Sequence, residues 1–169
     1  MAFNQPTIFQ ISRAGFFFLL VFVAGLMALS GFLASKVGPD HPFLPLTPYL
    51  AYIVLGFGPR KLFTKHHRRG CRAFHQGDPE AAIAHMEASY AFLQRHAWID
   101  RFRFLTMLSV SAMSYRELAL LNIAFFQTQL GRKDEATAAY HRVVAEFPGS
   151  LVGKQTLKMI ETFETPGTA

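Results

Sequence analysis

The pattern of apolar positions along the chain changes near residue 60. Between residues 14 and 59 apolar residues follow one another with few interruptions, whereas from about residue 63 they recur every three or four positions. Long apolar runs are typical of transmembrane helices, and a period of three to four residues is typical of amphipathic helices. We therefore expect an all-α protein, in which a two-helix transmembrane hairpin precedes a small domain of helical hairpins.

The first apolar run occupies residues 14–35, between Arg13 and Lys36. As a helix, its 22 residues span about 33 Å, enough to cross a hydrocarbon core of about 30 Å. A cleaved secretory signal is the alternative, because a basic residue precedes an apolar run that ends in small residues. The run is longer than a usual signal core, so we expect a transmembrane helix. The small residues spaced for close packing against another helix are Ala24, Ala28, Gly31 and Ser35.

Residues 43–59 form a second uncharged run, which is shorter and begins among the prolines Pro42, Pro45 and Pro48. Because proline is tolerated in the first turn of a helix, we expect this helix to start near Pro45 or Pro48. A re-entrant or interfacial segment is the alternative for so short a run. We favour a second transmembrane helix, with residues 36–42 as the loop between the two spans.

The net charge of +6 comes from one segment, since residues 60–72 carry six basic residues and no acidic one. Residues 73–169 carry nine basic and ten acidic residues, so nucleic-acid binding over a distributed basic surface is not expected. The six basic residues are Arg60, Lys61, Lys65, Arg68, Arg69 and Arg72. A basic segment directly after a span marks the cytoplasmic side, and it attracts anionic lipid head groups. We therefore expect a multi-pass protein of a bacterial inner membrane. Residues 1–13 and the helical domain would be cytoplasmic, and the 36–42 loop would be external.

Neither apolar run contains a His, Asp, Glu, Lys or Arg residue. Ionisable residues inside a membrane usually mark proton paths, ion sites or cofactor ligands, so a transporter, a channel or a haem-binding helix is not expected. The rest of the chain has no phosphate-binding glycine loop, nucleophile elbow or zinc-protease motif. We expect no catalytic activity, no cofactor and no small-molecule substrate.

His67, Cys71 and His75 recur every four residues and would lie along one stripe of a helix. The two histidines would be about 12 Å apart along a straight helix, too far to share one metal ion. We expect a basic helix beside the membrane here rather than a metal site.

Residues 121–148 predict two short amphipathic helices folded back on each other. Ser114 and Glu117 form an S-x-x-E capping box before the first helix, Gly131 separates the two helices, and Pro148 ends the second. The apolar positions are Leu120, Ile123 and Ala124 in the first helix, and Ala136, Tyr140, Val143 and Phe147 in the second. The spacing of three or four residues indicates one buried face on each helix.

This pair of helices resembles one unit of the tetratricopeptide repeat (TPR) family, a helix–turn–helix of about 34 residues. The resemblance covers about residues 117–150 and rests on six positions at the family's spacing. They are Leu120, Ala124, Gly131, Ala136, Tyr140 and Pro148. Gln127 departs from the family pattern, which usually has an aromatic residue at that position.

A second, less regular copy covers about residues 63–96. The matching positions are Gly70, Ala73, Gly77 and Ala82, with Asp78 as N-cap, Pro79 in the first turn and Met86 in place of an aromatic residue. A final helix over residues 150–163 would cap the array, with Leu151, Leu157 and Ile160 facing inward. The TPR-like domain would then span residues 63–163, followed by a tail at 164–169.

Residues 97–114 lie between the two copies and do not follow the TPR pattern. Aromatic residues alternate with arginines here, as at a membrane interface, where rings sit among head groups and arginine contacts phosphate. We favour a core helix that fills the space between the hairpins, and the membrane interface is the alternative. The residues concerned are Trp98, Arg101, Phe102, Arg103 and Phe104.

The TPR resemblance implies protein–protein recognition on a concave surface of stacked hairpins. About three repeats are usually needed to bury both faces, so we expect apolar surface to remain for a partner protein or the membrane. Spans that contain small residues and no ionisable ones favour a non-catalytic structural or accessory subunit of a larger membrane complex, such as a respiratory or photosynthetic one. The alternative is a membrane-tethered adaptor or assembly factor that binds partners reversibly through a polar groove, for which Asn122 is the candidate. In both cases the partners are other membrane proteins.

Overall fold

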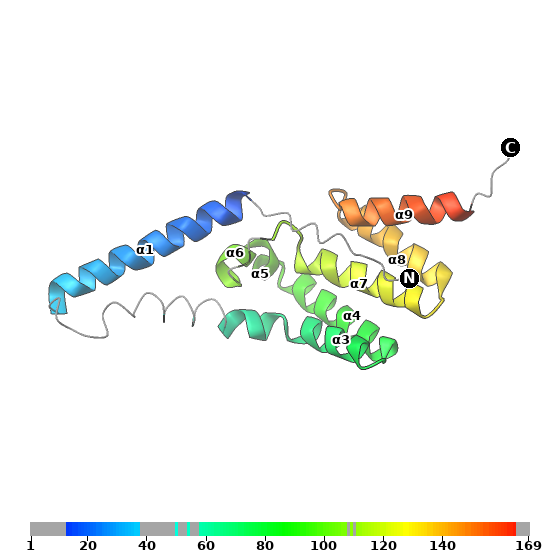
Figure 1. Cartoon of the computed structure of the whole chain (residues 1–169), viewed down its shortest axis with the longest axis horizontal. Helices are drawn as coiled ribbons and strands as arrows, with labels where there is room; N and C mark the ends of the chain where they lie inside the picture. The colour runs from blue at the N-terminus through cyan, green and yellow to red at the C-terminus, as the bar shows by residue number, and fades with distance from the viewer. Residues whose placement is uncertain are drawn as a thin grey trace. The chain divides into compact units, whose positions relative to one another are not determined.

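The computed structural model describes residues 13–37, 50, 54, 58–107, 109 and 111–164. Regular structure in these residues is helical (Figure 1), which confirms the predicted all-α class. The chain divides into two units, and the division does not follow chain order. The first unit comprises Met1–Phe63 and Arg101–Ala112, and the second comprises Thr64–Asp100 and Met113–Ala169.

The first unit contains helix α1, Arg13–Val37, which extends the predicted span by a residue or two at each end. Among the described residues, α1 is the one helix that is long and apolar enough to cross a membrane. The second predicted span lies outside the described residues except at Leu50, Val54 and 58–59. The 36–42 loop is described only at its first two residues, so the transmembrane hairpin stays a prediction.

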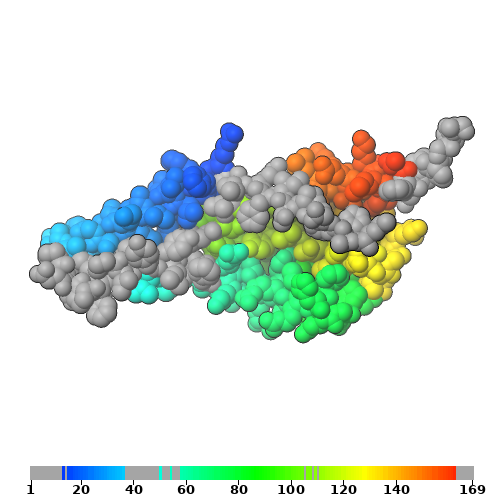
Figure 2. All heavy atoms as spheres, viewed as in Figure 1, coloured from blue at the N-terminus to red at the C-terminus, as the bar shows by residue number. Residues whose placement is uncertain are grey.

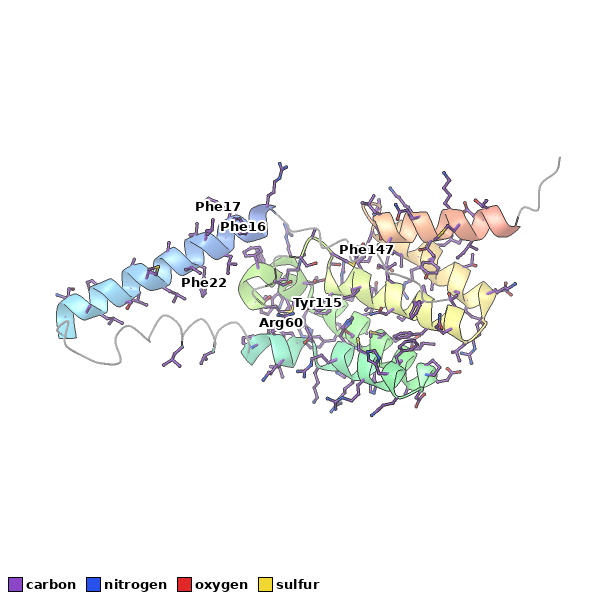
Figure 3. All side chains as sticks on the ribbon, in the orientation of Figure 1. Phe16, Phe17, Phe22, Arg60, Tyr115 and Phe147 are labelled. Atoms are coloured by element: carbon purple, nitrogen blue, oxygen red, sulfur yellow. The ribbon has the colours of Figure 1, made fainter. Side chains whose placement is uncertain are left out.

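The side chains of α1 are largely exposed within this unit, as the sphere and stick views show (Figures 2 and 3). Phe16 and Phe17 project from one side of the helix and Phe22 from another. Partly buried and buried residues follow a single stripe, and they are Gly15, Leu19, Phe22, Leu26, Ser30 and Ala34. The predicted packing stripe of Ala24, Ala28, Gly31 and Ser35 lies on another face and is exposed. That stripe therefore remains open in the described part of the chain.

The second unit is an array of helices in which each long helix packs against the next (Figure 1). These helices are α3 (Lys65–His75), α4 (Pro79–Arg95), α7 (Tyr115–Gln129), α8 (Lys133–Glu146) and α9 (Leu151–Glu164). Helix α3 packs on α4, α4 on α7, α7 on α8, and α8 on α9. The core between them includes Met86, Leu120, Ala124, Tyr140 and Val143, all buried.

Two glycines make the same turn in the α3–α4 and α7–α8 hairpins. Gly77 has φ +81° and Gly131 has φ +71°, values that glycine adopts without steric cost. The N–H of Asp78 donates to Ala73 O, and the N–H of Arg132 donates to Gln127 O, each five residues back. Such bonds are typical of a right-handed helix that ends in a residue with a left-handed backbone conformation. The turns of the two hairpins therefore have the same geometry, 54 positions apart in the chain.

Small residues let the two helices of each hairpin approach closely. A Cβ atom at Gly70 would lie 2.9 Å from Met86 Cε and 3.1 Å from Ala82 O, so a larger residue there would require these neighbours to shift. Ala124 occupies the equivalent position in the other hairpin and is also fully buried. Ala82 and Ala136, equivalent in the second helices, are buried too.

Two short helices, α5 (Ala97–Arg101) and α6 (Arg103–Thr106), connect the hairpins in place of the single core helix that was one alternative. Asp100, at the end of the second unit's part of this connection, is buried. Its carboxylate accepts hydrogen bonds from the N–H groups of Tyr115 (3.0 Å) and Arg116 (3.2 Å), in the first turn of α7. Ser114 Oγ accepts from Glu117 N at 3.1 Å, as the predicted capping box requires.

The expected surplus of apolar surface is not found on the described part of the second unit. Its exposed large hydrophobic side chains are Trp98, Leu151 and Met159, and Leu151 was expected to face inward. Leu157 is buried and Ile160 is partly buried, so α9 covers α8 through a narrower face than predicted.

Candidate functional site

Helix α3 presents a basic face to solvent. Lys65, Arg68, Arg69 and Arg72 are all exposed, and their spacing of three, one and three residues places them on one side of the helix. The opposite side of α3 packs into the array through buried His67, Gly70 and Ala73. The alternation of basic and small residues along α3 therefore separates a charged face from a packing face.

The positive charge of this face is not neutralised by acidic side chains of the described residues. No ion pair there involves Lys65, Arg68, Arg69 or Arg72. The acidic residues that begin α4 have other partners. Asp78 Oδ1 accepts a hydrogen bond from Ala81 N at 2.9 Å, and Glu80 pairs with Arg132 of the second hairpin.

An open hollow of about 350 Å³ lies between α3 and α4, next to the basic face. Its lining residues are Arg69, Arg72, Ala73, Gln76, Asp78, Ala81 and His85. A volume of this size is at the lower end of small-molecule sites. Two guanidinium groups and an amide offer hydrogen-bond donors of the kind that bind phosphate oxygens. These donors suit an anionic group, whereas the Asp78 carboxylate in the same lining opposes one.

The predicted basic cluster is divided between the two units. Arg60 (labelled in Figure 3) and Lys61 are exposed on helical residues 58–63 of the first unit. The other four basic residues form the face on α3, in the second unit. The structure therefore brings four of the six predicted residues together.

The three residues of the candidate metal stripe on α3 lie in different environments. His67 is buried, with its ring edge-on to Tyr115 at a centroid distance of 5.7 Å, and burial lowers the pKa of this imidazole. Cys71 is partly buried, and burial raises the pKa of its thiol, which lowers its nucleophilicity. His75 is exposed. Among the described residues, no three His, Cys, Asp or Glu side chains are placed to hold a metal ion.

The six residues on which the repeat resemblance rests lie either in the core of the array or in its turns. Leu120, Ala124, Ala136 and Tyr140 are buried. Gly131 forms the left-handed turn described above, and Pro148 lies in the turn after α8. Asn122, the candidate groove residue, is partly buried, with its amide nitrogen 3.9 Å from Met86 Sδ.

A polar cluster that joins α4 to α8 was not predicted. Tyr90 Oη donates a hydrogen bond to the Glu146 carboxylate, Arg142 Nε donates to the same carboxylate at 2.8 Å, and the guanidinium lies 4.5 Å from the Tyr90 ring centroid. Burial and the acceptor Glu146 raise the pKa of Tyr90. Burial opposes ionisation of Glu146, but hydrogen bonds from Tyr90 and Arg142 hold its pKa below the usual value. No local pattern reveals a contact between residues 56 positions apart.

The residues of the 97–114 insert have different surroundings. Trp98 and Phe102 are exposed, as is Arg101. Arg103 is partly buried and donates to the carbonyl oxygens of Ser111 and Ala112. Phe104, also partly buried, contacts Phe18 of α1 within the first unit.

Comparison with known proteins finds no match for this chain among protein-family models, curated proteins or solved structures. Its function is therefore inferred from the residues and their arrangement.

Proposed function

We propose that this chain is a non-catalytic, membrane-anchored subunit that holds a larger membrane complex together through α1 and through its helical array. The observation that supports this most directly is the exposed apolar surface of α1. Over Gly15–Lys36 the helix has the length and composition of a membrane span, and none of its most apolar stretch is buried. Such a surface requires lipid or partner helices around it.

The proposal includes a second span over residues 43–59, which would make the protein multi-pass with the array in the cytoplasm. Helix α3 begins six residues after that apolar run, and its basic face carries no acidic partner among the described residues. A basic helix directly after a span is attracted to anionic head groups at the cytoplasmic surface.

We further propose that the array of the second unit is TPR-like. Equivalent positions in its two hairpins have equivalent roles: Gly77 with Gly131 in the turns, Gly70 with Ala124 at the close approach, and Ala82 with Ala136 in the second helices. Asn122 contacts Met86, and Tyr90, Arg142 and Glu146 bond to one another. These polar groups thus have partners on the array itself, which favours a permanent subunit over an adaptor with an open polar groove.

The open stripe of small residues on α1 offers a test of this function. Gly31 lies on the stripe and Gly25 lies about 120° from Gly31 around the helix, and an added Cβ would meet nothing within 4 Å at either position. Gly31→Leu should therefore disturb only a partner that packs on the stripe, and Gly25→Leu is its matched control. The measurement is native mass spectrometry of the tagged chain, extracted in mild detergent from its own membranes.

We expect native mass spectra to show the unaltered chain and Gly25→Leu in a discrete, stoichiometric assembly. The Gly31→Leu variant should be absent from that assembly. A small species with substoichiometric, salt-sensitive partners would instead indicate an adaptor or assembly factor. Equal retention of partners by both variants would show that the stripe is not a packing face.

A further inference from the structure

The connection between the two hairpins leaves the helical array and joins α1. Residues 101–112 group with the first unit, and α6 packs against α1 there. The ring centroids of Phe104 and Phe18 are 4.3 Å apart, with an interplanar angle of 38°. A segment that interrupts the array is therefore held by the apolar helix.

The contact lies near one polar end of α1. Helix α1 begins at Arg13, the last charged residue before its apolar stretch. Phe18 follows five residues later, which corresponds to about 7.5 Å along the helix axis. Interfacial elements bury their apolar side about 5–10 Å into the boundary between head groups and acyl chains. If Arg13 lies at the head groups, Phe104 lies within that boundary.

One aromatic side chain of this connection is exposed, whereas Met107 is buried and Phe104 is partly buried. Phe102 retains 44% of its accessible surface, and its ring lies edge-on to Phe104 at 6.1 Å. Phe16 and Phe17, in the same turn of α1 as Phe18, are exposed as well. Aromatic rings gather at membrane interfaces, where their faces contact acyl chains. Arg101 next to Phe102 is exposed and long enough to reach a lipid phosphate.

Several polar groups among the described residues of the connection are bonded internally, as an apolar environment requires. Arg103 Nε donates to Ser111 O at 2.9 Å, and Arg103 Nη2 donates to Ala112 O at 2.7 Å. Ser109 N donates to Arg103 O at 3.1 Å, and Thr106 Oγ1 donates to Phe102 O at 3.1 Å. Carbonyl groups that would otherwise need water are thereby satisfied.

We propose that residues 101–112 form an interfacial membrane element that lies against the first turns of α1, with Phe102 inserted between lipid acyl chains. The occupant of this surface is the lipid bilayer itself, because exposed aromatic rings and a neighbouring arginine match its apolar and anionic layers. The inference rests on the proposed membrane anchoring of α1.

Tryptophan fluorescence of the full chain tests the depth of Phe102. Trp98 is the only tryptophan, so Trp98→Phe provides a background in which one indole reports one position. Phe102→Trp is the reporter, Met27→Trp near the middle of α1 is the deep control, and Met159→Trp on α9 is the control outside the membrane. All three native side chains are exposed, so the larger ring fits. Each variant is reconstituted in vesicles of phosphatidylcholine and phosphatidylglycerol with brominated lipids as quenchers.

We expect bromines near the glycerol end of the acyl chains to quench Phe102→Trp more strongly than bromines near the bilayer centre. Met27→Trp should show the reverse order, and Met159→Trp should lose little fluorescence with either lipid. Circular dichroism of each variant checks that its helix content is unchanged.

The controls separate the two proposals. If Met27→Trp is quenched by deep bromines while Phe102→Trp loses no more fluorescence than Met159→Trp, the interfacial element is wrong and the anchoring of α1 stands. If Met27→Trp is not quenched, the anchoring is wrong, and the interfacial element fails with it.

Discussion

His67 lies on the packing face of α3 against the edge of Tyr115, and burial lowers the pKa of its imidazole below 6.5. The unfolded chain binds this proton near pH 6.5, whereas the folded chain binds it only at lower pH. Unfolding is therefore increasingly favoured as pH falls below about 6.5, and the effect levels off below the folded-state pKa.

We predict that the melting temperature of the full chain in detergent falls between pH 7.5 and pH 5, and that His67→Phe removes part of this dependence while keeping the ring contact. His75→Phe, at an exposed position of the same helix, is the matched control and should melt with the wild-type pH dependence. Identical pH profiles for both variants would exclude His67 as the source.

The turn glycines carry a second prediction at this scale. An added Cβ at Gly77 or Gly131 meets nothing within 4 Å, so Gly→Ala there changes only backbone strain at φ +81° or +71°. A non-glycine residue in this region costs about 1–2 kcal/mol. Gly149→Ala is the control, because that glycine also has open space and is not among those with positive φ. Chemical denaturation should show a loss of stability for Gly77→Ala and Gly131→Ala, and little change for Gly149→Ala.

At the scale of helices, we predict that the basic face of α3 binds anionic lipid. Each basic residue near an anionic membrane surface contributes about 1 kcal/mol to attraction. We expect phosphatidylglycerol added to detergent micelles to raise the melting temperature of the full chain. Arg69→Gln/Arg72→Gln should reduce that shift, whereas Lys154→Gln/Lys158→Gln, which removes two exposed charges from α9, should leave it unchanged. An equal reduction in both would indicate a general charge effect and no specific face.

Some features of these helices are determined by local sequence, and others are not. The left-handed turns at Gly77 and Gly131 and the cap at Ser114 could be predicted, since each depends on residues within five positions. The carboxylate of Asp100 on the first turn of α7 and the Tyr90–Glu146 bond could not, because each joins segments that only the packed array brings together. Leu151 was assigned to the inner face from helical spacing alone, which does not specify how wide a face the neighbouring helix covers.

For the whole molecule, chain order is a poor guide to the division into units. A helical domain over residues 63–163 with a non-repeat insert at 97–114 was predicted, and residues 101–112 of that insert group with the N-terminal unit. The composition of the insert was ambiguous, since the same aromatic residues suit a core helix and an interface. The contact of Phe104 with Phe18 and the exposure of Phe102 support the proposed interfacial element, and neither could be read from composition.

Asp100 has a mechanical consequence for this excursion. Its carboxylate ties the point where the chain leaves the array to the point where it returns, through the N–H groups of Tyr115 and Arg116. A pulling force on residues 101–112 would therefore act first on these two hydrogen bonds, before it reaches the contacts between α4 and α7. For the proposed interfacial element, these bonds would shield the array from movement of the lipid, and the length of the excursion could change without altering the register of the two hairpins.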